Sequence, residues 1–153
     1  AHGDPAPAQL IVSGRRPPGH PDDRPPLRHL DDDAFVVEIN RRYGAIPPEI
    51  AAEREVLALL LPGLRADIAA LETHAPVARE PLASPILALG GEDDALTPRE
   101  HLEAWRHETR GECQVRTFAG GHFYLEPARR LVIEEILRVV AGRLPTQLAE
   151  ASS

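Results

Sequence analysis

Two apolar runs in the second half of the chain each lead through a pair of glycines to a titratable residue. Asp94 follows the run 86–89, and His122 follows the run 115–118. A carboxylate beside an imidazole orients the ring and stabilises the imidazolium that forms when the histidine takes a proton. Such a histidine acts as a base toward a hydroxyl and then as an acid toward the leaving group. The spacing therefore predicts Asp94 and His122 as two catalytic residues of a hydrolytic triad.

A neighbouring acid, Asp93, competes with Asp94 for this role. Asp94 stands at a fixed offset from Thr97–Glu100, a capping box with proline at the first helical position, which predicts the start of a helix. We therefore favour Asp94 and expect Asp93 to be a solvated neighbour. The alternative is that these acids only cap a helix and that His122 is an ordinary loop residue.

No residue of the chain has the sequence context of the third triad member. A nucleophile elbow requires Gly-x-Ser-x-Gly between a strand and a helix, and the sequence contains no such motif. Ser13 ends an apolar run, but no glycine stands two residues before it and no helix start follows. Ser84 and Cys113 precede their predicted strands, and a five-residue strand would hold Cys113 about 16 Å from His122. We expect Cys113 to be a small structural residue.

The elements that must position Asp94 and His122 alternate between strand and helix. Short apolar runs predict strands over 9–13, 85–89 and 114–118. Helical spacing and capping residues predict helices over 32–43, 48–52, 53–74, 98–108 and 127–140, with Pro62 kinking or splitting the longest one. Apolar strands joined by helices indicate a parallel sheet covered by helices. The predicted fold class is α/β, with three parallel strands and flanking helices.

The segment between the first two strands is much longer than an ordinary crossover. It spans about 28–75 and is predicted to be entirely helical. Ligands bind at the carboxyl ends of strands in such sheets, so we interpret this insertion as a lid over that end. The alternative is a long structural crossover. The whole of 1–153 is predicted to be a single partial α/β-hydrolase domain that includes this insertion, with a frayed tail over about 145–153.

Composition narrows the class of protein. The chain has 153 residues, 42% hydrophobic and 27% charged, which suits a single globular domain. A formal net charge of −7 argues against nucleic-acid binding. No apolar run is long enough to span a bilayer, and no signal peptide is recognisable. With a single cysteine, these features predict a cytoplasmic protein.

Cofactor and metal motifs are not found in the sequence. It contains no phosphate loop and no dinucleotide-binding glycine fingerprint. His101 and His107 are six residues apart and would lie on different faces of their helix, so they do not form a metal-binding pair. We therefore expect no cofactor and no metal.

Four segments resemble a known family. Ser13–Pro18, Leu30–Phe35, Leu61–Asp67 and Gly120–Leu125 are similar to segments of the type II thioesterases of polyketide and nonribosomal peptide biosynthesis. The resemblance runs from about residue 8 to 141 and includes the insertion as well as the triad loops. It implies an α/β-hydrolase fold and the hydrolysis of acyl thioesters from the phosphopantetheine arm of acyl or peptidyl carrier proteins. No membrane partner is implied.

The resemblance also assigns roles to residues. Asp94 and His122 match the acid and the base of the family's triad. The helices from 32 to 71 match its flexible lid, where Val56, Leu60 and Leu64 are expected to face the acyl pocket or each other. The family's Gly-His-Ser-Met-Gly elbow and its oxyanion loop have no counterpart in this sequence. The expectation is that the chain begins just before the family's sixth strand and is inactive alone.

Other roles remain open at this point. Arg15 and Arg16 are candidates to meet the phosphate of phosphopantetheine, and plain surface solvation is the alternative. Another α/β-hydrolase such as an esterase, or a noncatalytic module that docks carrier proteins, would also fit the sequence.

Overall fold

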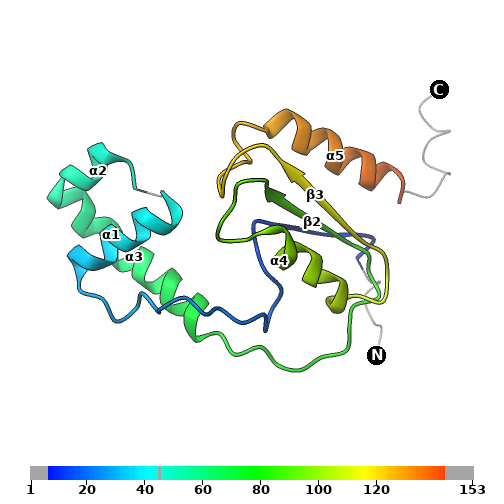
Figure 1. Ribbon diagram of the computed structural model, residues 1–153, viewed down its shortest axis with the longest axis horizontal. Helices are drawn as coiled ribbons and strands as arrows, with labels where there is room; N and C mark the ends of the chain where they lie inside the picture. Colours follow the sequence, from blue (N-terminus) through cyan, green and yellow to red (C-terminus); the bar gives the residue numbers. More distant parts are fainter. Residues whose placement is uncertain (1–6, 45, 144–153) are drawn as a thin grey trace. The chain divides into compact units, whose positions relative to one another are not determined.

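The computed structural model describes residues 7–44 and 46–143, and its centre is a three-stranded parallel sheet (Figure 1). The strands are β1 (Leu10–Ser13), β2 (Ile86–Gly91) and β3 (Cys113–Phe118), in the order β1-β2-β3. Leu10 pairs with Ile86, and Ile86 pairs with Cys113. The first residues of the three parallel strands therefore lie side by side at one edge of the sheet. The predicted α/β fold with three parallel strands and flanking helices is confirmed.

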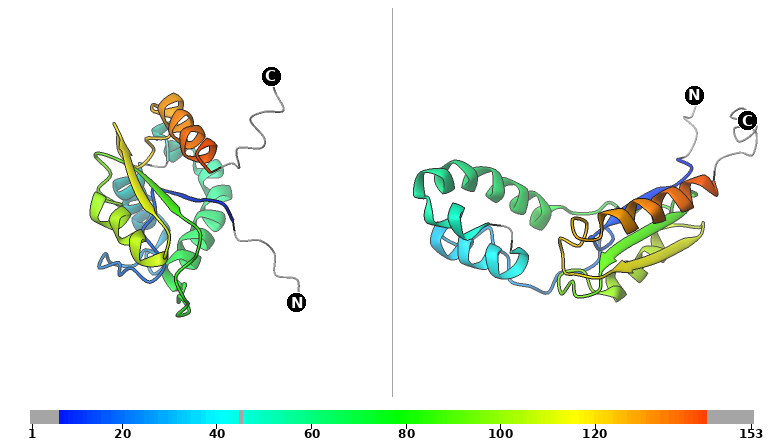
Figure 2. Two further views of the ribbon diagram at one scale, coloured as in Figure 1. Left: turned by 90° about the vertical axis from the view of Figure 1, so that its right-hand side faces the viewer. Right: turned by 90° about the horizontal axis from the view of Figure 1, so that it is seen from above.

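Helices cover both faces of the sheet, because the side chains of β2 alternate between two cores. Every residue of β2 is buried, as expected for a strand without polar alternation. Leu87 and Leu89 pack toward α5 (Arg129–Ala141) on one face. Ile86 and Ala88 pack toward α4 (Arg99–Glu103) and the 3₁₀ helix η1 (Ala104–Glu108) on the other. Figure 2 shows the same two layers from further directions.

The chain forms two compact units. One holds the sheet and is built from residues up to His20 and from Ala78 onward; the other is Pro21–Val77. The second unit contains α1 (Asp32–Tyr43), α2 (Pro48–Ala52) and α3 (Arg54–Thr73). It has a core of its own, formed by Leu27, Phe35, Ile39, Ile46, Leu61 and Ile68. The predicted tail over 145–153 lies outside the described residues.

Capping explains the ends of α1. The carboxylate of Asp31 accepts the amide of Ala34 at 2.8 Å, and two acids follow it in the first turn. Gly44 ends the helix in the left-handed region, with φ of 60°. Both ends lie where the sequence placed them.

Of the two outcomes predicted at Pro62, a kink or a split, the split is wrong, since α3 runs through this residue as one element. Proline removes one amide and leaves the carbonyl four residues earlier without its helical partner. Pro62 and Ala58 both lie on the exposed side of α3, so water can hydrate that carbonyl.

The predicted capping box at Thr97 is also wrong. Pro98 occupies the N-cap position of α4 without a side-chain cap. The hydroxyl of Thr97 instead donates to the carbonyl of Gly14, which is 83 residues away in sequence, at 3.0 Å. The Thr97 hydroxyl, which the sequence assigned to the helix cap, therefore forms a tertiary hydrogen bond.

Candidate active site

Asp94 and His122 lie in the loops that follow two neighbouring strands. The carboxyl ends of β2 and β3 are adjacent because the strands are parallel. Backbone bonds tie the two loops together: the amide of Glu92 donates to Phe118, and the amide of Asp93 donates to Gly120 at 3.0 Å. The loops therefore hold the two side chains at one edge of the sheet.

The predicted contact between Asp94 and His122 is present. Oδ2 of Asp94 lies 2.9 Å from Nδ1 of His122. The other oxygen, Oδ1, accepts the amides of Leu96 at 2.9 Å and Thr97 at 3.2 Å. Asp94 is only 4% exposed, and its neighbour Asp93 is exposed. Three hydrogen-bonding partners compensate the burial of the Asp94 carboxylate, and the geometry favours Asp94 over Asp93.

The end of β1 forms a third wall of this site. Gly14 adopts φ of 55°, and a Cβ built on it would lie 3.6 Å from Cε1 of the His122 ring. The ring therefore lies beside Gly14, at a distance that a Cβ on this residue would just span. Thr97, whose amide binds Asp94, donates its hydroxyl to the same Gly14.

Sequence reasoning gave no role to Tyr124, which is buried beside this wall. Tyr124 is 1% exposed, and its hydroxyl lies 2.7 Å from Oγ of Ser13. Its ring stacks on Phe118 with centroids 5.8 Å apart. Burial raises the pKa of the Tyr124 phenol, which the Ser13 bond partly offsets and the charge of Asp94 reinforces. The available signal was a tyrosine in an apolar stretch two residues after the histidine, whose hydroxyl needs a partner when buried.

Two of the weighed nucleophiles lie away from His122. Cys113 is the first residue of β3, whereas the loop of His122 follows the last residue, Phe118. Burial raises the pKa of the Cys113 thiol, which disfavours the reactive thiolate. Ser84 is buried before β2 begins. The sequence prediction that both stand at the amino end of their strands is confirmed.

The insertion residues differ in their surroundings. Leu64 is half-buried against the core of its own unit, while Val56 and Leu60 are 38% and 45% exposed.

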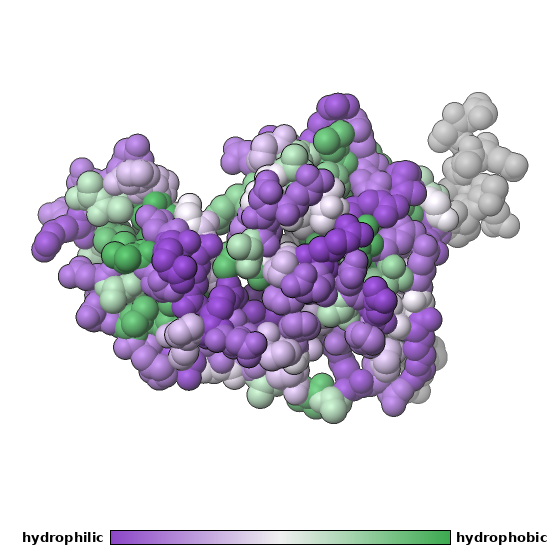
Figure 3. Space-filling model, in the orientation of Figure 1, coloured by the Kyte–Doolittle hydropathy of each residue, from purple (hydrophilic) through white to green (hydrophobic). Residues whose placement is uncertain are grey.

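In the sheet unit, the carbonyl of Arg15 accepts the indole N–H of Trp105 at 2.7 Å, which fixes the backbone that carries Arg15 and Arg16. The face of the molecule in Figure 3 is mainly hydrophilic, with apolar side chains in separate patches.

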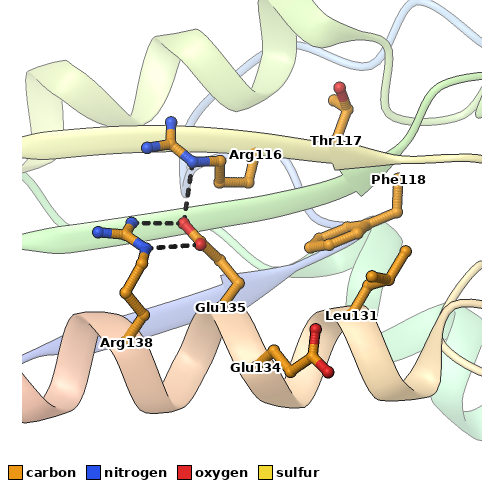
Figure 4. A pocket seen from close by; sticks show the side chains of 7 residues that line it. All are labelled: Arg116, Thr117, Phe118, Leu131, Glu134, Glu135 and Arg138. Carbon is orange, nitrogen blue, oxygen red and sulfur yellow. Dashed lines mark hydrogen bonds and ion pairs between the residues drawn. The ribbon is translucent and has the colours of Figure 1, made fainter.

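A shallow pocket of about 320 Å³ lies between β3 and α5 (Figure 4). Glu135 stands between two arginines there, with Arg116 at 2.9 Å and Arg138 at 2.7 Å. These pairings, Arg138 first, hold the pKa of Glu135 below its usual range. Glu134, which also lines the pocket, pairs with Arg130 at 2.7 Å. The charged groups of the pocket are therefore engaged in ion pairs, and we assign the pocket a structural role at the edge of the sheet.

Among residues 7–44 and 46–143, no three histidine, cysteine or acidic side chains come together as a metal-binding group. In the same part of the chain, no helix combines the length and apolar character required to cross a membrane.

Comparison with known proteins places this geometry in a family. A family model of the thioesterase domain matches residues 3–141. Thioesterase PikA5 of Streptomyces venezuelae is 42% identical over 121 residues, which are 78% of this chain. The solved structure of ClbQ, from the colibactin NRPS/PKS pathway, superposes with a TM-score of 0.83 at 26% identity over 93% of the chain. YbtT, a type II thioesterase from the yersiniabactin NRPS/PKS pathway, superposes at 0.79 with 30% identity over 92%.

The chain corresponds to only part of these proteins. It spans 42% of the length of PikA5, 60% of the ClbQ chain and 57% of the YbtT chain. The family match nevertheless includes the loops that carry Asp94 and His122 and the helical insertion. The chain therefore belongs to the thioesterase domain family.

Proposed function

We propose that this chain supplies the acid and base of an editing thioesterase in polyketide or nonribosomal peptide biosynthesis, including antibiotic biosynthesis. Its substrates would be acyl thioesters on the phosphopantetheine arm of acyl or peptidyl carrier proteins. The observation that carries the proposal is the buried Asp94 carboxylate 2.9 Å from Nδ1 of His122, in a chain of the thioesterase family. Relatives named for NRPS/PKS pathways support the substrate class.

The proposed chemistry uses the second ring nitrogen of His122. Because Asp94 holds Nδ1, Nε2 is the atom that exchanges protons. Nε2 takes the proton of a serine hydroxyl as its oxygen attacks the thioester carbonyl, and then gives that proton to the departing thiolate. Water attacks the acyl-serine in the same way and releases the free acid and the serine. The serine belongs to a Gly-x-Ser-x-Gly elbow that this sequence does not contain, so the chain alone is expected to be inactive.

The helical insertion is assigned to substrate selection. We propose that the segment of about 28–75 within the domain 1–153 acts as a lid and that Val56, Leu60 and Leu64 line an acyl pocket. The exposure of Val56 and Leu60 supports this role, because apolar side chains left in solvent are suited to an apolar ligand. A cytoplasmic location agrees with the free thiol of Cys113.

A second candidate is a noncatalytic module that docks carrier proteins. The lack of a Gly-x-Ser-x-Gly motif favours it over an independent enzyme. The two candidates differ in one respect that can be measured: only the enzyme needs His122.

The test joins this chain to the upstream segment of a relative whose sequence carries a Gly-x-Ser-x-Gly motif. The joined protein should hydrolyse an acyl-carrier thioester, and His122→Ala should lower the rate by about 10⁶-fold, as loss of the base does in a well-studied serine protease. His107→Ala, at an exposed histidine, is the matched control. The unjoined chain is assayed in parallel.

Each contrary outcome identifies a different error. Hydrolysis that survives His122→Ala would reject the assigned base. Turnover by the unjoined chain would place a nucleophile within it. Cleavage of simple oxygen esters but not of carrier thioesters would indicate an esterase, and carrier binding without hydrolysis by the joined protein would favour the docking module.

A further inference from the structure

The end of β1 is bonded to the loop that carries the acid. The hydroxyl of Thr97 donates to the carbonyl of Gly14 at 3.0 Å, and the amide of Thr97 donates to Oδ1 of Asp94 at 3.2 Å. One residue therefore links the backbone of β1 to the carboxylate. Gly14 is 83 residues from Thr97 in the sequence, whereas Asp94 is three residues from it.

The same end of β1 is bonded to the segment that follows the base. Oγ of Ser13 and the hydroxyl of Tyr124 lie 2.7 Å apart. The amide of Tyr124 donates to the carbonyl of Gly121, the residue before His122, at 3.1 Å, and its carbonyl accepts the amide of Ala128 at 2.9 Å. The turn that carries His122 is thus connected through one buried side chain to β1.

We propose that Ser13 and Tyr124 are positioning residues that hold the ring of His122 between Gly14 and Asp94. Their hydroxyl pair fixes the separation between the end of β1 and the His122 turn, while Thr97 fixes β1 relative to Asp94. The consequence for catalysis rests on the proposed function. The positioning itself is a property of this chain and can be measured without a substrate.

The surroundings of the His122 ring explain why the hydrogen bond between Ser13 and Tyr124 affects its position. The ring of His122 lies beside Gly14, which has no side chain, and a Cβ built on Gly14 would reach the ring at 3.6 Å. Gly14 has no side chain to fill the space beside the ring, so the distance between them is set by the positions of the two backbone segments. Tyr124 is buried and stacked on Phe118, which leaves its hydroxyl in one place. Burial raises the pKa of this phenol, so it keeps its proton at neutral pH.

This assignment also gives Ser13 a role other than that of a nucleophile. Ser13 is the last residue of β1 and is exposed, so alanine at this position creates no cavity. Its hydroxyl is engaged with a phenol, which is a far weaker base than the imidazole that activates serine in triads.

The experiment is a double-mutant cycle on the chain as it exists, read by NMR of the histidine rings. Ser13→Ala and Tyr124→Phe each remove one hydroxyl of the pair. Each should speed the exchange of the His122 Nδ1 proton with water by about fivefold, the effect expected for the loss of one hydrogen bond. The double variant should be no worse than either single one, because both remove the same bond. His122→Gln assigns the signal.

Two further variants separate positioning from general stability. Thr109→Val removes a buried hydroxyl that bonds to Leu82 and Ser84 before β2 begins; it should lower the melting temperature without changing exchange at His122. Ser13→Thr keeps a hydroxyl and should restore slow exchange. Unchanged exchange in Ser13→Ala, or additive effects in the double variant, would overturn the proposal. If Tyr124→Phe fails to fold, the exposed Ser13 variants still decide it.

The joined protein described above adds a catalytic arm. There, Ser13→Ala should lower kcat about fivefold and leave KM unchanged, since the base and not the substrate site is disturbed. A joined protein without any hydrolysis would refute the proposed function while leaving the NMR result on positioning valid.

Discussion

The backbones of Gly91, at the end of β2, and Gly121, in the loop before His122, lie in direct contact. A Cβ built on Gly91 would overlap the carbonyl oxygens of Gly120 and Gly121. Both obstacles are backbone atoms, so no side-chain rotation can relieve the overlap. The close approach of the loops that carry Asp94 and His122 therefore depends on the absence of a side chain at Gly91.

Gly91→Ala should destabilise the chain and disturb the site together. We expect a loss of about 3 kcal/mol in the free energy of unfolding, because the added methyl group forces backbone to move. The same movement should weaken the bond between His122 and Asp94. Chemical denaturation measures the first effect, and NMR of the His122 ring measures the second.

Gly63→Ala is the control for this substitution. Gly63 lies within α3, and nothing stands within 4 Å of a Cβ built there. Alanine in a helix should stabilise the chain by about 0.5–1 kcal/mol relative to glycine. If both variants behave alike, the close packing at Gly91 has no energetic consequence.

Asp94→Asn should separate the two tasks of this carboxylate. Asparagine keeps an acceptor for the amides of Leu96 and Thr97, so the melting temperature should change little. Its amide would face Nδ1 of His122 as a donor and favour the wrong ring tautomer. In the joined protein kcat should fall about 10⁴-fold, the effect of the same change in a trypsin-like triad. Activity near the wild-type level would mean that Asp94 only caps the loop.

Asp94→Ala provides the comparison for stability. It removes the acceptor as well, so two loop amides lose their partner at a cost of about 1–3 kcal/mol. Equal melting temperatures for the alanine and asparagine variants would contradict the capping role of Oδ1.

The local sequence was sufficient to predict those site residues that are recognised from their immediate neighbours in the chain. Asp94 and His122 were predicted because each follows an apolar run and a glycine pair, and parallel strands bring such positions together. The roles of Thr97 and Tyr124 were not predictable in this way. Their partners, Gly14 and Ser13, are 83 and 111 residues away, and only the folded sheet brings them into contact.

The error at Pro62 has the same origin. Proline has a strong local preference against helix interiors, but the helix also buries Leu61 and Ile68 in a shared core. Packing of that face outweighs one lost hydrogen bond on the exposed face. The sequence shows the local preference and does not show how much core the helix gains.

Hydrogen exchange should be faster in α3 than in β2. Of the 20 residues of α3 only Leu61 and Ile68 are buried, whereas all six residues of β2 are buried. Segments with few buried contacts open locally at a lower free energy than the core. Native-state hydrogen exchange followed by mass spectrometry measures the protection of the amides in α3 and in β2. Equal protection would argue that the insertion is a rigid crossover and would remove support for a lid.

Acid should destabilise the sheet unit through His101. Burial lowers the pKa of His101 below its usual 6.5, and the nearby His20 ring and Arg16 add to this, while Glu100 opposes it. The folded state therefore favours the neutral ring. This stability is present above about pH 6.5 and is lost as the pH falls through the lowered pKa. The melting temperature of His101→Gln should depend less on pH between about 5 and 7; His107→Gln, at an exposed position, should retain the full dependence.

Self-association should depend on the flank of α5 that is turned away from β3. Ile133 and Leu137 are 50% and 62% exposed and lie one turn apart, opposite the flank where Leu131 lines the pocket beside Phe118. Among the described strands, β1 is paired on one side only, and an apolar edge strand is a template for association. Leu137→Glu should shift sedimentation toward the monomer at micromolar concentration without lowering the melting temperature, since the side chain is already in water. Leu131→Glu is the matched control on the other flank. A sharply melting monomer in the unmodified chain would contradict the prediction and would indicate that this surface is stable in solvent.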